Sequence, residues 1–242
     1  MKISVCMATF NGGRFISEQL DSIRMQIESS DEIIIVDDAS SDDTVERIRS
    51  CHDDRIRIIE HEINLGVVQS FQQALEEATG DIIFLSDQDD LWKKDKVRTV
   101  CDIFQSQPET TLVLSDAEIL DETGRVTMTS FYALLGAPFK HTVFANLAKN
   151  RYMGCVMAFR RTMLNLILPM PAGLPMHDVW IGLLNSIYGK VYFEGRPLIG
   201  YRRHQANASQ ISASSLGCIL RWRIRLVYYL LGRMLRVRFF DS

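Results

Sequence analysis

The chain has 242 residues, 47% of them hydrophobic, and a formal net charge of −3. Such a chain can bury the core of one large domain or two small ones, which excludes a disordered or fibrous protein. Its five cysteines are scattered and odd in number, which favours a reducing compartment over a disulfide framework. The N-terminus reads directly as a strand and lacks the apolar segment of a signal peptide. We therefore expect a cytosolic catalytic or binding domain.

The first half of the chain alternates apolar runs with helical patterns. The apolar runs are bounded by polar or glycine residues, as buried strands are, and they cover residues 3–8, 33–36, 56–59 and 82–85. Helical periodicity fills the gaps between them, over residues 15–23, 45–48 and 67–78. This alternation predicts an α/β fold in which helices cover both faces of a mostly parallel sheet.

The alternation weakens after Trp92. We expect helices over 93–104, 142–150 and 179–188, and strands over 112–115, 153–159 and 190–196. Residues 124–140 have no clear period and could shape a substrate pocket or a lid. Residues 205–215 are rich in Ser, Ala, Asn and Gln, which is typical of a linker.

Two or more carboxylates follow each of two predicted strands. Residues 80–92 read GDIIFLSDQDDLW, so Asp87, Asp89 and Asp90 come directly after one strand, and Asp37 and Asp38 come after another. Open α/β sheets bind their ligands at the carboxyl ends of the strands. Like charges gathered there need a partner, and a divalent cation such as Mg2+ or Mn2+ takes carboxylate oxygens and shares them with phosphates. A solvated acidic turn, with Asp90 as the N-cap of the next helix, is the alternative.

Seven short motifs occur in the order found in one enzyme family. They are residues 8–12 (ATFNG), 36–40 (VDDAS), 64–66 (NLG), 87–90 (DQDD), 154–155 (GC), 177–178 (HD) and 202–204 (RRH). On these motifs the sequence resembles the family 2 inverting glycosyltransferases with a Rossmann-like GT-A fold, in particular the bacterial rhamnosyltransferase-like branch that builds surface polysaccharides. The resemblance implies a GT-A domain over 1–204, with a nucleotide-sugar-binding half (1–116) and an acceptor-binding half (117–204).

The resemblance also implies roles on the donor side. Asp38 would accept a hydrogen bond from the pyrimidine N–H, Asp87 would approach the ribose, and Asp89 would ligate the Mn2+ or Mg2+ that bridges the diphosphate. Further donor-binding candidates are Thr9, Asn11, Asp37, Asn64, Gly66 and Arg202, and further metal ligands are Asp87 and His204. Ordinary turn and helix-entry chemistry is the alternative for Thr9, Asn11, Asn64 and Gly66.

An acceptor hydroxyl needs a base, and a sheltered carboxylate can serve as one. In the family that the chain resembles, the base is the acid of the motif occupied here by His177 and Asp178, which makes Asp178 the candidate. A helix N-cap is the alternative role for Asp178. Attack from the face opposite the leaving group would invert the anomeric configuration. Candidates for acceptor contacts or for support of the site are Asp90, Gly154, Cys155, His177 and Trp180.

Residues 216–242 form a basic tail with six arginines and one aspartate, which leaves a charge of −8 on the rest of the chain. At 100° per residue, Arg221, Arg225, Arg233 and Arg236 occupy about a third of the helix circumference. The longest charge-free run, 226–232, is far shorter than the roughly 20 residues that span a bilayer. We expect an amphipathic helix that lies in the cytoplasmic membrane surface. Packing on the catalytic domain or on a second subunit, as in a homo-oligomer, is the alternative.

The sequence thus predicts a peripheral, metal-dependent glycosyltransferase of bacterial surface polysaccharide (O-antigen) synthesis. It would move a sugar, such as the deoxyhexose rhamnose, from a nucleoside-diphosphate sugar to a saccharide or lipid-linked acceptor. Nucleic acid is not an expected partner, because the positive charge is confined to the tail. A nucleotidyltransferase would carry basic residues in a Gly-rich loop after the first strand, where only Arg14 is basic. A non-catalytic subunit that binds nucleotide sugars or tethers an assembly is the alternative.

Overall fold

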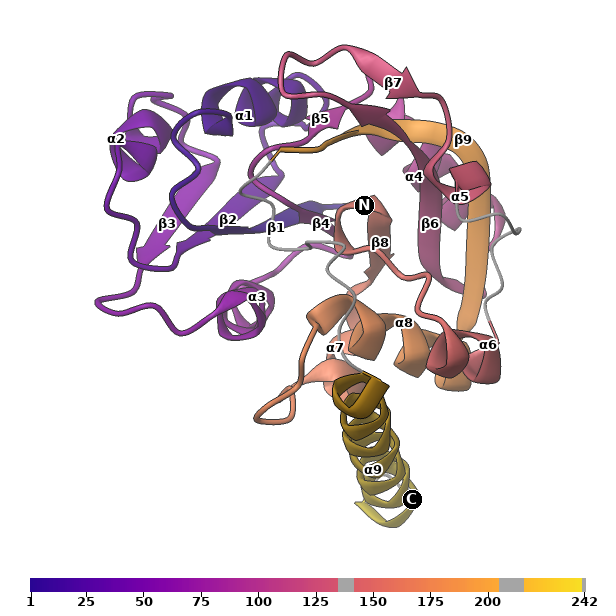
Figure 1. The fold of residues 1–242 in the computed structure, drawn as a ribbon. Helices are drawn as coiled ribbons and strands as arrows, with labels where there is room; N and C mark the ends of the chain where they lie inside the picture. The colour runs from indigo at the N-terminus through magenta and orange to yellow at the C-terminus, as the bar shows by residue number, and fades with distance from the viewer. Residues whose placement is uncertain (135–141, 205–215, 241–242) are drawn as a thin grey trace.

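The structure is a computed structural model and describes residues 1–134, 142–204 and 216–240. A single sheet runs through its centre in the order β3-β2-β1-β4-β8-β6-β9-β5, with β7 paired to β6 (Figure 1). The strands are β1 (Ile3–Thr9), β2 (Glu32–Asp37), β3 (Ile56–Glu60), β4 (Ile82–Ser86), β5 (Leu91–Trp92), β6 (Thr110–Leu120), β7 (Val126–Met128), β8 (Met157–Arg160) and β9 (Lys190–Arg202).

The first four strands form a parallel half-sheet. β1 pairs with β2 on one side and with β4 on the other, and β2 pairs with β3, all in parallel. Figure 1 shows α1 (Ile16–Arg24) and α2 (Thr44–Arg49) on one side of these strands and α3 (Val67–Glu76) on the other. Strands covered on both faces need apolar side chains throughout, which is why β2 and β4 read as unbroken apolar runs. The predicted α/β fold is therefore confirmed.

The other half of the sheet is mixed rather than parallel. β8 runs antiparallel to both β4 and β6, while β6 and β9 are parallel to each other. The short strand β5, which the sequence does not predict, pairs antiparallel with the end of β9. The direction of a strand is set by its connection and not by its own residues, so local periodicity could not supply it.

Two strands are longer than predicted, and one is shorter. β6 and β9 extend beyond 112–115 and 190–196 because they pair with each other along almost their whole length. The run 153–159 begins as a 3-10 turn, η1 (Gly154–Val156), and becomes β8 only at Met157. The irregular segment 124–140 contains β7 and α5 (Phe131–Leu134), and its residues 135–141 lie outside the described residues.

The remaining helices connect and cover this second half. They are α4 (Lys96–Ser106), α6 (Val143–Ala148), α7 (Leu164–Ile167), which follows the 3-10 turn η2 (Arg161–Met163), and α8 (His177–Tyr188). The first nine residues of α8 are all buried, because it packs against α3, α6, α7 and the sheet. This burial fixes the position of the His177–Asp178 pair at its N-terminus.

The basic tail forms α9 (Leu216–Phe240), which packs on the preceding part of the chain through part of its circumference. Leu226, Leu230 and Arg233 are buried, so one arginine of the predicted basic face points inward. The opposite side of α9 leaves seven large apolar side chains exposed: Leu220, Ile224, Val227, Tyr228, Leu231, Met234 and Leu235. We call these seven residues the outer stripe. No described helix combines the length and the apolar composition needed to cross a bilayer. The predicted linker, 205–215, lies outside the described residues.

Candidate active site

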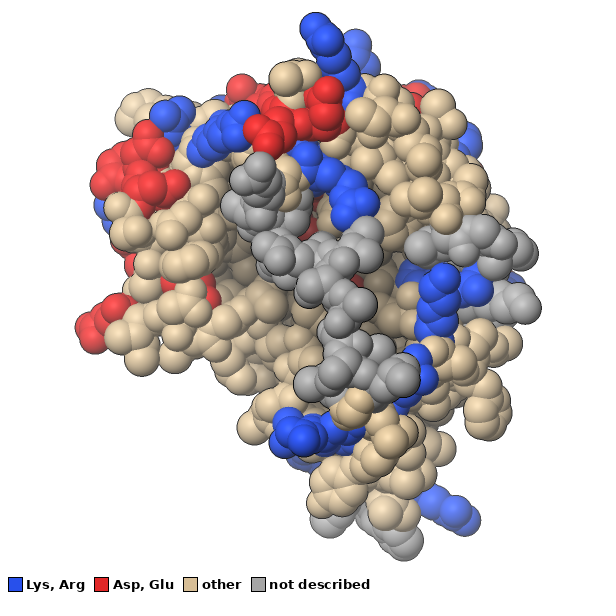
Figure 2. All heavy atoms as spheres, in the orientation of Figure 1, with Lys and Arg blue, Asp and Glu red and all other residues tan. Residues whose placement is uncertain are grey.

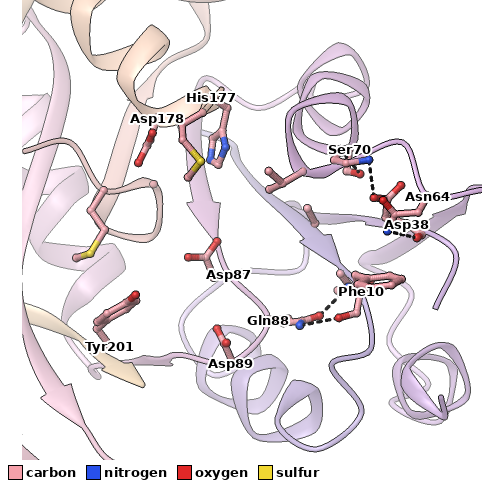
Figure 3. Close-up of a pocket in the computed structure, with 17 residues that line it drawn as sticks. Phe10, Asp38, Asn64, Ser70, Asp87, Gln88, Asp89, His177, Asp178 and Tyr201 are labelled. Carbon is pink, nitrogen blue, oxygen red and sulfur yellow. Dashed lines mark hydrogen bonds between the residues drawn. The ribbon is translucent and has the colours of Figure 1, made fainter. Parts of the chain in front are cut away.

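A pocket of about 440 Å³ opens beside the carboxyl ends of β1 and β4. The chain leaves β1 toward β2 and β3 on one side of the sheet and returns to β4 on the other, which makes this the point where the strand order reverses. Such switch points form ligand-binding crevices in open α/β sheets. Figure 3 shows Asp178, Asp87 and Asp89 along one side of the pocket and Asp38 with Asn64 at its opposite end.

Asp38 lines the pocket and organises the loop between β3 and α3. Its carboxylate accepts hydrogen bonds from the backbone N–H groups of Leu65 and Gly66, both at 2.8 Å, and lies 2.8 Å from Nδ1 of His61. Gly66 has a φ of 89°, a conformation that favours glycine. Asn64 donates from Nδ2 to the Asp38 carbonyl at 3.2 Å. The predicted residues Asp38, Asn64 and Gly66 therefore come together at one end of the pocket.

Thr9, Asp37 and Asn11 are also brought close together, but only Thr9 lines the pocket. The Asp37 carboxylate accepts from the hydroxyls of Thr9 at 2.8 Å and Ser40 at 2.6 Å. Asn11 Oδ1 accepts from the backbone N–H of Ser41 at 2.8 Å. In the structure Asp37 and Asn11 join the loops after β1 and β2, so their expected donor contacts stay predictions.

Asp87 and Asp89 line the pocket, and Asp90 lies buried behind them. Burial, and then the neighbouring carboxylates of Asp89 and Asp178, raise the pKa of Asp87 to about 7. Burial also raises the pKa of Asp89, and it raises that of Asp90 well above its ordinary value. Asp90 Oδ1 accepts from the backbone N–H of Arg202 at 3.0 Å, so Asp90 is not the solvated helix cap that was the alternative.

A buried lysine lies behind this acid cluster. Lys96 is 1% exposed, and its Nζ donates to the carbonyl of Cys155 at 2.8 Å and lies 4.7 Å from the Trp92 ring centroid. Burial lowers the pKa of Lys96 to about 8, although Asp90 and Asp87 act in the opposite direction. Cys155 is fully buried and its thiol pKa is raised by burial, so it packs as a small apolar residue. The sequence gives no sign of this lysine beyond its place on an apolar helix face.

His204 and Arg202 both contact Asp89, the first at its carboxylate and the second at its backbone carbonyl. His204 Nε2 lies 2.7 Å from Asp89 Oδ2. Arg202 is 3% exposed, and its guanidinium donates to the carbonyl of Asp89 at 2.9 Å and to the Glu18 carboxylate at 2.6 Å. The structure brings the predicted ligands Asp89 and His204 together. Arg202 does not line the pocket, so its contact with the diphosphate stays a prediction.

Asp178 and His177 line the pocket from the start of α8. Asp178 lies in the first turn of α8, where Met176 holds the N-cap position, and its Oδ1 accepts from the N–H of Val179 at 2.6 Å. Burial raises the pKa of Asp178 to about 7 and lowers that of His177 to about 3, so the imidazole is neutral near pH 7. Both ring nitrogens of His177 lack a hydrogen-bond partner within the described chain, and the ring stacks on Phe71.

Gly154 and Trp180 support this side of the pocket in different ways. A Cβ atom on Gly154 would lie 2.8 Å from His177 Nε2, so glycine is what lets the imidazole approach the backbone there. Gly154 lines the pocket. Trp180 is fully buried away from it, and its Nε1 donates to the carbonyl of Ile167 at 2.9 Å. Trp180 therefore supports the helix rather than contacting a ligand.

Eight residues that line the pocket were not predicted from the sequence as site residues, Tyr201 and Gln88 among them. Tyr201 lines the pocket, whereas its neighbour Arg202, which was predicted, does not. Successive residues of a strand point to opposite faces, so this alternation could have indicated that only one of Tyr201 and Arg202 faces the pocket. Gln88 also lines the pocket, and its amide exchanges two hydrogen bonds with the backbone of Phe10, at 2.9 and 3.0 Å. The signal for Gln88 was its position between two predicted acids.

The donor atoms of the acid cluster fit a hard divalent cation. Carboxylate oxygens of Asp87 and Asp90 and the Cys155 sulfur lie within 4.8 Å of one another, and Asp90 Oδ2 is buried with no hydrogen-bond partner among the described residues. Several carboxylates and an imidazole suit Mn2+ or Mg2+, whereas a thiol does not suit Mg2+. Asp87 and Asp90 are therefore the carboxylates that lie close enough to share a Mn2+ or Mg2+, and this group does not contain the predicted ligands Asp89 and His204.

A family model described as Glycosyl transferase family 2 matches residues 4–168. The match includes the acid cluster and ends before Asp178 and His204. Among curated proteins, the chain is 27% identical over 190 residues to UDP-Glc:alpha-D-GlcNAc-diphosphoundecaprenol beta-1,3-glucosyltransferase WfgD of Escherichia coli. This alignment covers 76% of the chain and 70% of WfgD.

Two solved structures share the fold. TarS of S. aureus, residues 1–349 in complex with UDP-GlcNAc, superposes with a TM-score of 0.72 over 99% of the chain and 73% of that 1–349 segment, at 16% identity. The mannosyltransferase PcManGT of Pyrobaculum calidifontis, in complex with GDP-Man and Mn2+, superposes with a TM-score of 0.61 over 97% of the chain and 63% of its own length, at 20% identity. At these identities the likeness shows a common fold.

Proposed function

Since the chain belongs to glycosyl transferase family 2, we propose that it transfers a sugar, with inversion, from a nucleoside-diphosphate sugar to a hydroxyl of a saccharide or lipid-linked saccharide. One observation carries this proposal. A buried carboxylate with a raised pKa, Asp178, lines the same pocket as an acid pair, Asp87 and Asp89, and as Asp38. The pocket therefore offers a base, a site for the diphosphate and a polar end for the nucleotide.

Asp178 acts as the general base in this proposal. A base works best when its pKa lies near the working pH, and burial raises the pKa of Asp178 to about 7. The ionised carboxylate takes the proton of the acceptor hydroxyl while the oxygen forms a bond to the anomeric carbon. The bond from that carbon to the diphosphate breaks, and the nucleoside diphosphate leaves on the opposite face. A single displacement of this kind inverts the configuration.

On the donor side, Asp38 retains acceptor capacity for a base N–H. The Asp38 Oδ2 atom accepts one hydrogen bond, from Gly66, and a carboxylate oxygen can accept two. Asp87 and Asp89, with His204, are the residues that would hold Mn2+ or Mg2+. The bound ion supplies stabilisation of the negative charge that develops on the leaving diphosphate.

We propose the class of donor and acceptor by analogy with the relative WfgD. The relative WfgD is named for a UDP-Glc donor and a diphosphoundecaprenol-linked acceptor, and both fit a pocket with a polar nucleotide end and a base. The deoxyhexose donor expected from the sequence stays a prediction. A dTDP-rhamnose arm in the donor panel tests it directly.

We also propose that α9 lies in the cytoplasmic face of a membrane through its outer stripe, which makes the enzyme peripheral. Arg221, Arg225 and Arg236 are exposed and lie along one edge of that stripe. Figure 2 shows the basic side chains of α9 at the opposite end of this face from the main acidic clusters. An apolar helix face bordered by arginines suits an anionic lipid surface, because the apolar side chains enter the interface and the guanidinium groups stay at the head groups.

The test is a panel of nucleotide sugars that includes UDP-glucose, UDP-GlcNAc, GDP-mannose and dTDP-rhamnose, each with Mn2+. We expect one donor to release nucleoside diphosphate, faster with a bacterial lipid extract as acceptor source. Asp89→Ala or a chelator should lower that rate roughly 100-fold, because several kcal/mol of charge stabilisation are lost. The matched control is Asp95→Ala, which removes an exposed carboxylate on the same stretch of chain.

Two outcomes contradict the proposal at different levels. Donor binding without release, even with the lipid extract, identifies a non-catalytic nucleotide-sugar-binding subunit. If nucleoside diphosphate is still released after both chelation and Asp89→Ala, the transferase assignment stands, but the acid cluster does not hold a metal needed for the reaction.

A further inference from the structure

The inner face of α9 is fixed to the segment that leads to Asp178. Arg233 is 8% exposed, and its guanidinium donates to three backbone carbonyls. Nη1 donates to Leu166 at 2.6 Å and to Leu168 at 2.9 Å, and Nη2 donates to Pro169. We name residues 168–176 the base loop, because they connect α7 to the start of α8, where Asp178 lies.

Two further side chains hold the base loop, from opposite sides. Tyr229, one turn before Arg233 on α9, donates from its hydroxyl to the carbonyl of Ala172 at 2.7 Å. From α3, the Gln72 Oε1 atom accepts from the backbone N–H of Met170 at 2.8 Å. The base loop is therefore held between α3, which borders the nucleotide end of the pocket, and α9.

Arg233 also touches the helix that carries Asp178. Its guanidinium carbon lies 5.3 Å from the ring centroid of Trp180, two residues after Asp178 on α8. Trp180 in turn donates to the carbonyl of Ile167, next to the carbonyls that Arg233 binds. One guanidinium therefore contacts the end of α7, the base loop and the first turn of α8.

The chemistry of this contact favours arginine over lysine. The last carbonyls of a short helix have no partner within the helix, and burial makes an unpaired carbonyl costly. A guanidinium presents five N–H groups in a rigid plane and can serve several carbonyls at once, whereas an ammonium is a single point. Leu230 and Leu226, buried about one and two turns earlier, bring the helix close enough for this.

We propose that Arg233 is a positioning residue for transfer, which holds the base loop so that Asp178 meets the acceptor hydroxyl. On this proposal α9 is an integral part of the active site as well as the element that carries the outer stripe. The inference rests on the assignment of Asp178 as the base. Displacement of a catalytic group by about 1 Å can lower a rate roughly 100-fold.

The experiment compares Arg233→Met with Arg236→Met in the full chain. Both variants remove one positive charge from α9, but Arg236 is exposed. We expect Arg233→Met to lower kcat for transfer 10-fold to 100-fold, with the affinity for UDP and the KM of the donor within twofold of the unchanged chain. Arg236→Met should leave all three quantities within twofold. Arg233→Lys should recover part of kcat.

Amide hydrogen exchange measures the contact between Arg233 and the base loop without requiring catalytic turnover. Residues 168–176 should exchange at least tenfold faster in Arg233→Met than in Arg236→Met, while the loop around Asp38 should be unchanged. Tyr229→Phe loses one hydrogen bond and retains its ring, so it should increase the exchange rate of residues 168–176 by a smaller amount. It therefore tests the same contact if Arg233→Met fails to fold. If the unchanged chain turns over no donor, the proposed function fails, and hydrogen exchange still tests the contact.

The inference is overturned if Arg233→Met and Arg236→Met agree in kcat and in exchange of the base loop. It is also overturned if Arg233→Met weakens UDP binding as much as it lowers kcat, because a merely structural role would disturb the whole pocket.

Discussion

Asp178 and Asp89 are both buried acids, yet their surroundings suit them to different tasks. Burial raises the pKa of Asp178 to about 7, and no Lys or Arg lies within salt-bridge distance of it among the described residues. Burial likewise raises the pKa of Asp89, but His204 and then Arg202 lower it in part. Acids in different environments can serve one as a proton acceptor and the other as a charge-bearing group. We propose that Asp178 is the proton acceptor.

This difference predicts the pH dependence of transfer. Because the base must be ionised, kcat should rise with pH up to about 7 and should fall about tenfold for each pH unit below 6. Asp178→Asn should lower kcat by roughly 100-fold or more and leave donor binding unchanged. A pH–rate profile and a donor titration on both proteins check this. Loss of donor binding in the variant would instead assign Asp178 to the donor.

Thermal unfolding provides the control for the Asp178 carboxyl itself. A folded pKa above the unfolded one means that the stability contributed by this group is present below about pH 4 and is lost as the pH rises through 7. Asp178→Asn should therefore raise the melting temperature at pH 8 and not at pH 4. Equal melting behaviour of the two proteins at pH 8 would show that the carboxyl is not held in a buried site.

At the scale of elements, the segment from His61 to Gly66 acts as a unit around Asp38. The Asp38 carboxylate accepts hydrogen bonds from His61, Leu65 and Gly66. Burial of His61 lowers the pKa of its imidazole, but the hydrogen bonds to Asp38 and Gln73 raise it by more, so the pKa of His61 is raised. At this end of the pocket, one carboxylate thus fixes the loop between β3 and α3 through its hydrogen bonds.

Asp38→Asn should disturb this loop, because an amide has one acceptor oxygen where the carboxylate has two. One backbone N–H of the loop would then face the NH2 group, at a cost of about 1–3 kcal/mol in unfolding free energy. We expect that loss in chemical denaturation and a weaker affinity for UDP. Asp54→Asn, the same change at an exposed position, should alter neither quantity. Unchanged stability of Asp38→Asn would contradict the described contacts.

Considering the whole molecule, α9 has two faces to which we assign separate roles. Its inner face, with Leu226, Leu230 and Arg233, belongs to the catalytic domain. Its outer stripe has no covering among the described residues. Mutations on the two faces should therefore separate membrane binding from catalysis.

Leu231→Gln combined with Leu235→Gln tests the outer stripe. Withdrawal of two leucines from the membrane interface costs roughly 3 kcal/mol, or about 100-fold in partitioning. Sedimentation with anionic phospholipid vesicles should show this loss while the melting temperature and kcat on a soluble acceptor remain. Met25→Gln with Ile63→Gln replaces two exposed apolar residues elsewhere and should bind vesicles normally. A loss of self-association instead of vesicle binding would identify a second copy of the chain as the occupant.

The sequence by itself determined the elements that rest on local pattern. Apolar runs indicated β1, β2 and β4, and the acids after the runs of β2 and β4 predicted one ligand-binding edge, because parallel strands end at the same edge. The resemblance added Asp178, which the structure brings into that same pocket. These features depend on neighbours in sequence or on strand order alone.

Only the tertiary structure decided the features that depend on partners distant in the chain. Pairing of β6 with β9 set the lengths of both strands and turned Tyr201, rather than Arg202, into the pocket. Packing placed Lys96 behind the acids and Arg233 against the base loop, although both are charged residues that a sequence pattern assigns to the surface. A buried charge is stable only where particular acceptors converge on it, and that convergence exists only after the chain has folded.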